Sequence, residues 1–380
     1  MSPKRPIVIV TDATARAVLA VCRGLGARGF AVACASASTV APAQWSRYCS
    51  RRLILPTLES SAEHYVEELA TLVEQDDYAL LIPGTDQSLV TISAHRDRLE
   101  GHVRLALPSH ATVLRALDKR QLAAAASAVG IPAPETAVCH SLEEALSAAE
   151  RFGYPVLLKP RFVVSGLGDI VERYGSTRVE DPDELKLNAS EIEAPYLVQR
   201  FAVGHVVSCA GVRAGKSTLA LAVSRSIRNW PPGRGGWAFS ITIEPTAGMI
   251  DVVERLVDEL DWEGIFEVEL IAHPDGSFSA IDLNPRPYGS LALAIAAGAN
   301  LPAIWTEWVL RQSPQPVRAR PGVYYRWEDA DVRRCMKHLR LWQLRDAATI
   351  MRPRRKVVHA YFRRDDPSPF FARLLEGGHA

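Results

Sequence analysis

The sequence has little net charge, few cysteines and no long hydrophobic run. Its 44 Lys and Arg residues against 43 Asp and Glu residues leave a formal net charge of +1 over 380 residues, so we expect no nucleic acid as its main partner. No apolar run reaches the roughly 18–20 residues that cross a bilayer, and we expect no membrane span. The six cysteines are scattered without a CxxC pair. Because such cysteines are typical of a reducing compartment, and the N-terminal segment lacks a signal-peptide apolar region, we expect a cytoplasmic protein.

Two common phosphate-binding motifs are also absent. The first strand-like run is followed by TDATAR at 11–16 rather than by GxGxxG, which argues against a classical dinucleotide site. The segment AGVRAGKS at 210–217 has the ending of a P-loop but not its first glycine. A P-loop must open a helix, whereas TLALAVSR at 218–225 is typical of a strand. We therefore expect neither motif to function here.

What is present is the composition of a soluble globular protein of two or three domains, with 48% hydrophobic and 23% charged residues. Over the first hundred residues, strand-like runs at 6–10, 30–35 and 78–82 alternate with helical patterns at 15–28 and 61–74. This rhythm predicts a doubly wound parallel sheet. Four polar residues follow its strands: Thr11, Asp12, Thr85 and Asp86. They are helix N-caps or, because ligands gather at the carboxyl ends of parallel strands, part of a binding site.

The pattern changes after residue 110. A helix is predicted at 111–129 and a short acidic one at 141–151, with Ser141 as N-cap. A strand at 154–160 ends near Lys159 and precedes a glycine-bearing turn at 161–170. After a strand at 196–199, alternating segments at 206–212 and 218–225, and at 265–271 and 279–283, predict two hairpins. The block from 196 to 283 is therefore expected to be antiparallel, closed by a helix at 290–297.

The final part of the chain is basic. Residues 331–364 contain eleven Lys or Arg and two Asp or Glu, a local charge of +9. Apolar residues such as Leu339 and Trp342 interleave with the charges, so we expect a solvated helical face folded onto the body. RNA, a membrane surface or an anionic substrate remain alternative partners for this charge.

One group of residues has the chemistry of a metal–phosphate site. Lys159 at a strand end can neutralise phosphate oxygens, and the SGLG segment at 165–168 can present backbone amides to them. Asp282 and Asn284 are two residues apart on one strand and so share a face, with Arg286 at the same parity. Together with Glu269 on the preceding strand, these oxygen ligands suit Mg²⁺ bound to nucleotide phosphates.

The order of these motifs resembles the ATP-grasp superfamily of carboxylate–amine and carboxylate–thiol ligases, over residues 7 to about 310. The likeness is strongest to its carbamoyl-phosphate-synthetase-like and amino-acid ligase branch. The nucleotide lysines of the family resemble Lys119 in LDKRQL and Lys159 in PVLLKP, and its lid loop resembles Ser165-Gly166-Leu167-Gly168. Its adenine hinge resembles Gln199-Arg200-Phe201, whose backbone would pair with the base edge. Its metal ligands resemble Glu269, Asp282 and Asn284, and its phosphate-side arginines resemble Arg286 and, more loosely, Arg228.

The resemblance implies a fold and a reaction. It implies an N-terminal α/β domain at 1–110, a linker helix and lid at 111–195, an antiparallel C-terminal subdomain at 196–312 and a basic helical extension at 313–380. ATP and two Mg²⁺ ions, or Mn²⁺ in their place, would be bound between the subdomains. A small-molecule carboxylate, such as that of an amino acid or peptide, would become an acyl phosphate and then an amide. Lys159, Arg228 and Arg286 would be catalytic, and a homodimer is one candidate assembly.

Three departures from the family pattern keep alternatives open. Asp282 stands where the family usually has glutamate, Gly204-His205 follows the hinge where an acid often binds the ribose, and residues 164–170 contain no basic side chain. A carboxylase resembling the biotin-dependent enzymes and a non-catalytic ATP-binding protein therefore remain alternatives. The glycine-rich segment at 230–236 is either a substrate loop or a plain surface loop.

Overall fold

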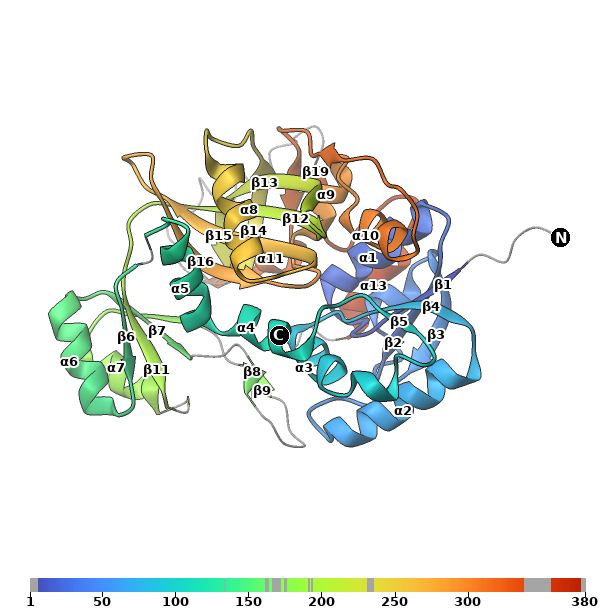
Figure 1. The fold of residues 1–380 in the computed structure, drawn as a ribbon, viewed down its shortest axis with the longest axis horizontal. Helices are drawn as coiled ribbons and strands as arrows, with labels where there is room; N and C mark the ends of the chain where they lie inside the picture. The colour runs from blue at the N-terminus through green and yellow to red at the C-terminus, as the bar shows by residue number, and fades with distance from the viewer. Residues whose placement is uncertain are drawn as a thin grey trace.

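Three sheets follow one another along the chain (Figure 1). The computed structural model describes residues 6–132, 134–160, 164–165, 172–173, 176–190, 192, 194–230, 236–337 and 357–376. A parallel sheet lies at the right of Figure 1, a small antiparallel sheet at the left, and a large mixed sheet above and between them. No helix in the described part of the chain has the length and hydropathy of a membrane span.

The N-terminal sheet is parallel throughout, as the sequence predicts, with the strand order β3-β2-β1-β4-β5. Strand β1 is the four-residue run IVIV, buried on both faces, which explains its apolar sequence. The strands are β1 (Ile7–Val10), β2 (Ala31–Ser36), β3 (Cys49–Ile54), β4 (Tyr78–Ile82) and β5 (Arg104–Leu105). The helices are α1 (Arg16–Ala27), α2 (Ala62–Gln75) and α3 (Asp86–Ala94), with short 3₁₀ turns η1 (Pro42–Trp45) and η2 (Arg96–Arg98).

The sequence analysis missed the two edge strands of this sheet. Strand β3 has the sequence CSRRLI and alternates between half-buried and exposed positions. Its arginines suit an edge, where charged residues oppose pairing with other chains, but they hide the strand in a search for apolar runs. Strand β5 has only two residues.

A linker and a small sheet follow. The single helix predicted at 111–129 is two helices, α4 (His110–Leu117) and α5 (Lys119–Ala128). The chain breaks at Asp118, whose extended backbone and side-chain hydrogen bond to the Arg120 N–H make it the N-cap of α5. The small sheet has the order β10-β7-β11-β6 and is antiparallel. Its elements are β6 (Thr136–Cys139), α6 (Leu142–Phe152), β7 (Val156–Pro160), β10 (Thr177–Val179), α7 (Pro182–Ala189) and β11 (Tyr196–Arg200). Between β7 and β10, β8 (Val164–Ser165) pairs with β9 (Glu172–Arg173).

The large sheet has the order β16-β15-β12-β13-β14-β18-β19, with β17 paired to β13. Both predicted hairpins are present: β12 (His205–Ala214) with β13 (Ser217–Trp230), and β15 (Gly264–Ala272) with β16 (Phe278–Asn284). The remaining elements of this half are β14 (Gly236–Thr242), α8 (Met249–Glu259), α9 (Leu291–Ala296) and α10 (Leu301–Val309). The core runs from this sheet into the N-terminal sheet, since each of two apolar clusters contains buried residues from both.

The C-terminal extension is not the purely helical addition that we expected. It contributes β17 (Val317–Arg318), β18 (Tyr324–Arg326) and β19 (Val357–His359) to the large sheet. It also forms α11 (Glu328–Lys337) and α13 (Ser368–Leu375). Residues 338–356, the centre of the basic segment, lie outside the described residues. The pairings of β17 with β13 and of β18 with β19 are parallel, so the sheet is mixed.

A buried ion pair joins the end of the chain to its beginning. Arg23 of α1 donates from Nε to Asp366 Oδ2 at 2.8 Å and from Nη2 to the Tyr361 carbonyl at 2.7 Å. Asp366 also accepts from Ser46 Oγ at 2.7 Å and from the Arg47 N–H at 2.8 Å. The Arg23 and Asp366 side chains are 8% and 1% exposed, so neither charge is screened by water. Figure 1 shows the result, with α13 lying against the N-terminal half.

We expect Asp366→Ala to lower the free energy of unfolding by about 3–5 kcal/mol, because it leaves the Arg23 charge buried without a partner. The measurement is the midpoint of urea unfolding. Asp365→Ala is the matched control, since the adjacent Asp365 side chain is 42% exposed and such surface changes usually stay within about 0.5 kcal/mol. Equal midpoints for the two variants would contradict the prediction.

Candidate functional site

Four oxygen-bearing side chains meet on one face of the β15–β16 hairpin. The antiparallel register places Glu267 opposite Asn284 and Glu269 opposite Asp282. Because residues two apart on a strand share a face, all four side chains lie together. We call these residues the acidic cluster. The structure thus brings together the three predicted metal ligands, Glu269, Asp282 and Asn284.

Glu267 is the member of the acidic cluster that the sequence analysis missed. It is buried, accepts from Ser208 Oγ at 2.7 Å, and accepts from Asn284 Nδ2 at 3.1 Å. Its position was readable from the sequence, since it precedes Glu269 by two residues in FEVELI. Through these two hydrogen bonds it holds the Asn284 amide in one orientation.

Burial and neighbouring carboxyl groups raise the pKa values of the two glutamates. Burial raises the pKa of Glu267 to about 7. Burial and the neighbouring Glu267 and Asp282 raise the pKa of Glu269 to about 8. A cation bound nearby would favour the ionised form of these carboxyl groups. Carboxylate oxygens are also the ligands that Mg²⁺ prefers. The residues therefore fit a magnesium ion.

Within the described residues, no three His, Cys, Asp or Glu side chains form a metal site by themselves. Mg²⁺ is usually held by one or two carboxylates and takes its other ligands from water and substrate phosphates.

Two lysines face the acidic cluster from other elements. Lys119, the first residue of α5, places Nζ 3.6 Å from Asp282 Oδ1 and 3.4 Å from Ser176 Oγ. Lys159 on β7 is 4% exposed. Burial and the charge of Lys119 lower the pKa of Lys159 to about 7, while Asp282 and Glu269 oppose the shift. Both predicted nucleotide lysines are thus brought to the acidic cluster, where phosphate oxygens would stabilise their charged forms.

Arg286 follows β16 and ties the acidic cluster to the N-terminal sheet. Its Nε and Nη2 atoms donate to Asp86 Oδ1 and Oδ2, each at 2.7 Å, and Nη2 also donates to Asn284 Oδ1 at 3.1 Å. Asp86 opens α3 directly after Thr85, which is the N-cap and forms a capping box with Ser88. Of the four strand-end residues, Thr85 is therefore a cap, while Asp86 is a partner of the site.

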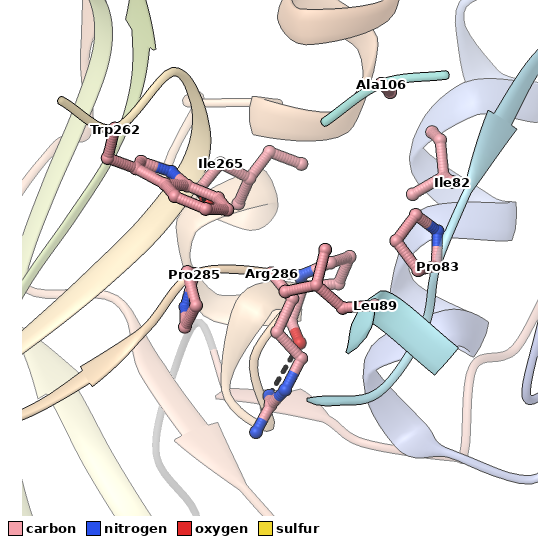
Figure 2. Close-up of a pocket in the computed structure, with 9 residues that line it drawn as sticks. Ile82, Pro83, Leu89, Ala106, Trp262, Ile265, Pro285 and Arg286 are labelled. Carbon is pink, nitrogen blue, oxygen red and sulfur yellow. Dashed lines mark hydrogen bonds between the residues drawn. The ribbon is translucent and has the colours of Figure 1, made fainter. Parts of the chain in front are cut away.

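A small cavity of about 20 Å³ lies beside Arg286 at this junction, lined by residues of both halves. Figure 2 shows Pro83 and Leu89 of the N-terminal half facing Arg286 and Pro285 of the other. Its volume is about that of one water molecule, so the two halves are closely packed here.

The other two strand-end residues form a separate network. Thr11 Oγ1 donates to Asp12 Oδ2 at 2.6 Å, and Asp12 Oδ2 also accepts from Ser88 Oγ at 2.6 Å. The N–H of Gly84 points at both side chains. A Cβ at Gly84 would come within 2.5 Å of the Thr11 carbonyl oxygen, so only glycine fits. Neither Thr11 nor Asp12 is the N-cap of α1, which is Ala15.

Arg228 lies in a different cluster. Its Nε and Nη2 atoms donate to Asp331 at 3.1 and 2.8 Å, and its guanidinium stacks on the Phe239 ring at 4.4 Å. Arg326 also pairs with Asp331, at 3.2 Å. These described contacts join Arg228 to the C-terminal extension rather than to the acidic cluster, so a role at the transferred phosphate stays a prediction.

The predicted hinge crosses the end of β11. Gln199 donates to Thr136 Oγ1 at 2.8 Å, the Arg200 N–H donates to the Glu135 carbonyl at 2.8 Å, and Phe201 stacks under the Arg178 guanidinium at 4.4 Å. Because the Arg200 N–H already has a partner, pairing with a base edge would fall to other backbone atoms of this segment. Of the predicted lid loop, Ser165 pairs through β8 with Glu172 of β9, whereas Gly166 and Gly168 lie outside the described residues.

Comparisons with known proteins identify related sequences. Residues 118–192 match the family model of the ATP binding domain of the carbamoyl-phosphate synthase L chain, and residues 195–330 match that of the ATP-grasp in the biosynthetic pathway with Ter operon. The N-terminal section of the carbamoyl phosphate synthase large chain from Aquifex aeolicus is 25% identical over 205 residues. That match covers 51% of this chain and 36% of the relative.

Solved structures show the same fold over most of the chain. The N5-carboxyaminoimidazole ribonucleotide synthetase from Thermotoga maritima has a TM-score of 0.60 at 17% identity, covering 83% of this chain and 78% of that one. The L-amino acid ligase from Bacillus licheniformis has a TM-score of 0.62 at 16% identity, covering 85% and 79%. The chain is therefore a member of the ATP-grasp superfamily, a group of ATP-dependent ligases, and is related to carbamoyl-phosphate synthase.

Proposed function

We propose that this protein is an ADP-forming ligase that activates a carboxylate as an acyl phosphate and joins it to an amine. The observation that supports this most directly is the convergence of Lys119 and Lys159 on the acidic cluster. Cations and carboxylates from four elements meet there, as phosphoryl transfer requires, since its catalysis depends on positioning and charge neutralisation.

Different residues would bind the phosphates, the metal ion and the base of ATP. Lys119 and Lys159 would neutralise phosphate oxygens, while Glu269, Asp282 and Asn284 would hold Mg²⁺. When bound, Mg²⁺ neutralises charge on the triphosphate and makes the γ-phosphate a better electrophile. Glu267 orients Asn284, and Asp86 orients Arg286 beside it. Gln199, Arg200 and Phe201 would hold the base, as the resemblance implies.

The proposed chemistry needs no protein nucleophile. A carboxylate oxygen of the substrate attacks the γ-phosphorus, the bond to the β-phosphate oxygen breaks, and ADP leaves. The amine nitrogen then attacks the acyl carbon, inorganic phosphate leaves, and the nitrogen loses a proton. Arg286, which donates to Asn284 Oδ1, would stabilise charge on the phosphoryl group.

The first experiment identifies the products of ATP and Mg²⁺ incubated with pooled amino acids and amines. We expect ADP and phosphate to form only in the presence of the pool. Lys159→Ala and Asn284→Ala should each lower the rate by a factor of roughly 10² or more, because both remove charge stabilisation at the phosphates. Lys216→Ala is the matched control, since Lys216 is an exposed residue of the β12–β13 turn.

Circular dichroism and thermal unfolding would show that the variants remain folded. Formation of AMP and pyrophosphate would exclude the acyl-phosphate route. Full activity in either Lys159→Ala or Asn284→Ala would remove that residue from the site.

A second prediction concerns Glu267, which we assign as a positioning residue. Glu267→Ala should raise the Mg²⁺ concentration needed for half-maximal activity about 10- to 100-fold, because the Asn284 amide loses the partner that orients it. Glu267→Gln retains an oxygen that can accept from Ser208 or Asn284, and should recover most of this loss. If both variants instead lower the maximal rate at an unchanged Mg²⁺ requirement, Glu267 does not act through a metal ligand.

A further inference from the structure

Arg16 connects the carboxyl edge of the N-terminal sheet to the segment that follows Arg286. It is the first residue of α1, and its Nε donates to the carbonyl of Gly289 at 3.0 Å. Tyr325 of β18 donates its hydroxyl hydrogen to the same carbonyl oxygen, at 2.9 Å. Three segments far apart in the sequence therefore meet at the Arg16 side chain.

The residues around Arg16 leave a flat and narrow space for its guanidinium. The guanidinium lies over the Trp327 ring, 3.7 Å from its centroid. Two glycines leave room for it: a Cβ at Gly289 would come within 2.4 Å of Nη2, and a Cβ at Gly236 would come within 3.2 Å of the same atom. Stacking on an aromatic ring fixes the plane of a guanidinium while leaving its edge able to donate hydrogen bonds.

Three more deeply buried arginines each pair with a carboxylate, and Arg16 differs from them. Arg23 pairs with Asp366, Arg228 with Asp331 and Arg286 with Asp86. Arg16 is half-buried, yet among the described residues it has no carboxylate partner. The Nε1 atom of the same Trp327 ring is buried and has no hydrogen-bond partner in the described part of the chain. A cation without a carboxylate partner among the described residues, beside a buried donor without an acceptor among them, indicates an anionic ligand.

The distance between the Arg16 contact and Arg286 limits the size of the ligand. Gly289, which Arg16 contacts, is three residues along the chain from Arg286, so the two backbone positions are at most about 10 Å apart. Small molecules with two functional groups separated by a few bonds can span such a distance. Carboxylates match the planar fork of an arginine better than single-point anions do.

We propose that Arg16, stacked on Trp327, binds a non-reacting carboxylate of the substrates, while the reacting carboxyl carbon lies at Arg286 and the acidic cluster. This inference rests on the proposed ligase function and narrows its substrate class. The second carboxylate belongs either to a dicarboxylic acid that is activated or to an amino acid that serves as the amine. In both cases Arg16 determines specificity and takes no part in phosphoryl transfer.

The test measures ADP release with carboxylate-bearing substrates and with the corresponding neutral amides. One arm offers dicarboxylic acids and their monoamides as the acid, and the other offers α-amino acids and α-amino amides as the amine. We expect the parent protein to prefer the carboxylate over the amide by about 10-fold or more in kcat/KM in one arm. That arm identifies which substrate carries the second carboxylate.

In Arg16→Gln we expect this preference to fall close to 1, through a rise in KM for the carboxylate-bearing substrate, with KM for ATP unchanged within twofold. Trp327→Leu should shift the same KM in the same direction, because the guanidinium loses its platform. Arg255→Gln is the matched control, since Arg255 is an exposed residue of α8, and it should behave as the parent does.

Two results would overturn the inference while leaving the ligase function standing: a parent protein that accepts amides as well as carboxylates in both arms, or an Arg16→Gln protein that keeps the parent's preference. Equal losses toward carboxylate and amide would assign Arg16 a structural role and would also overturn it. If no acid and amine release ADP from the folded parent protein, the proposed function itself fails and the inference fails with it.

Discussion

The bidentate ion pair between Asp86 and Arg286 is the constraint on which the site depends. The two side chains are 3% and 10% exposed, so their attraction acts with little screening, and loss of one partner would leave the other buried and charged. Arg286 in turn donates to Asn284, Asn284 donates to Glu267, and Glu267 accepts from Ser208. A continuous line of hydrogen bonds thus runs from the start of α3 through β16 and β15 to β12. The orientation of the N-terminal sheet is thereby coupled to the geometry of the predicted metal ligands.

The pKa values of the buried groups at the site are shifted in the directions that a charged ligand would reverse. Glu267 and Glu269 have raised pKa values because they are buried beside one another, and Lys159 has a lowered pKa because it is buried beside Lys119. Each group is therefore harder to ionise than it would be in water. On the proposed function, a magnesium nucleotide would supply a cation to the carboxylates and phosphate oxygens to the lysines. It would thereby favour the charged forms that burial disfavours.

Strand parity and motif order predicted much of the site, and long-range contacts account for what they did not predict. Glu269, Asp282 and Asn284 meet because a two-residue repeat on paired strands fixes which side chains share a face. Glu267 obeys the same repeat and could have been included. Asp86 was identified as a strand-end residue, but its pairing with Arg286 joins positions 200 residues apart, and no local pattern encodes that. The resemblance predicts a role for Arg228 at the phosphates. Its partner Asp331, however, belongs to the segment that the sequence analysis predicts as a helical extension. The helix break at Asp118 was hidden because the apolar pattern continues through it.

The ion pair between Arg23 and Asp366 has a consequence for the order in which the protein can mature. Arg23 and Asp366 are 343 residues apart in the sequence, so during synthesis the charge of Arg23 is not neutralised until the segment around residue 366 has been made. Until then α1 and the η1 turn lack the carboxylate that Arg23, Ser46 and Arg47 share. A nascent chain that is truncated anywhere before residue 366 therefore carries an incomplete first domain as well as an incomplete last one.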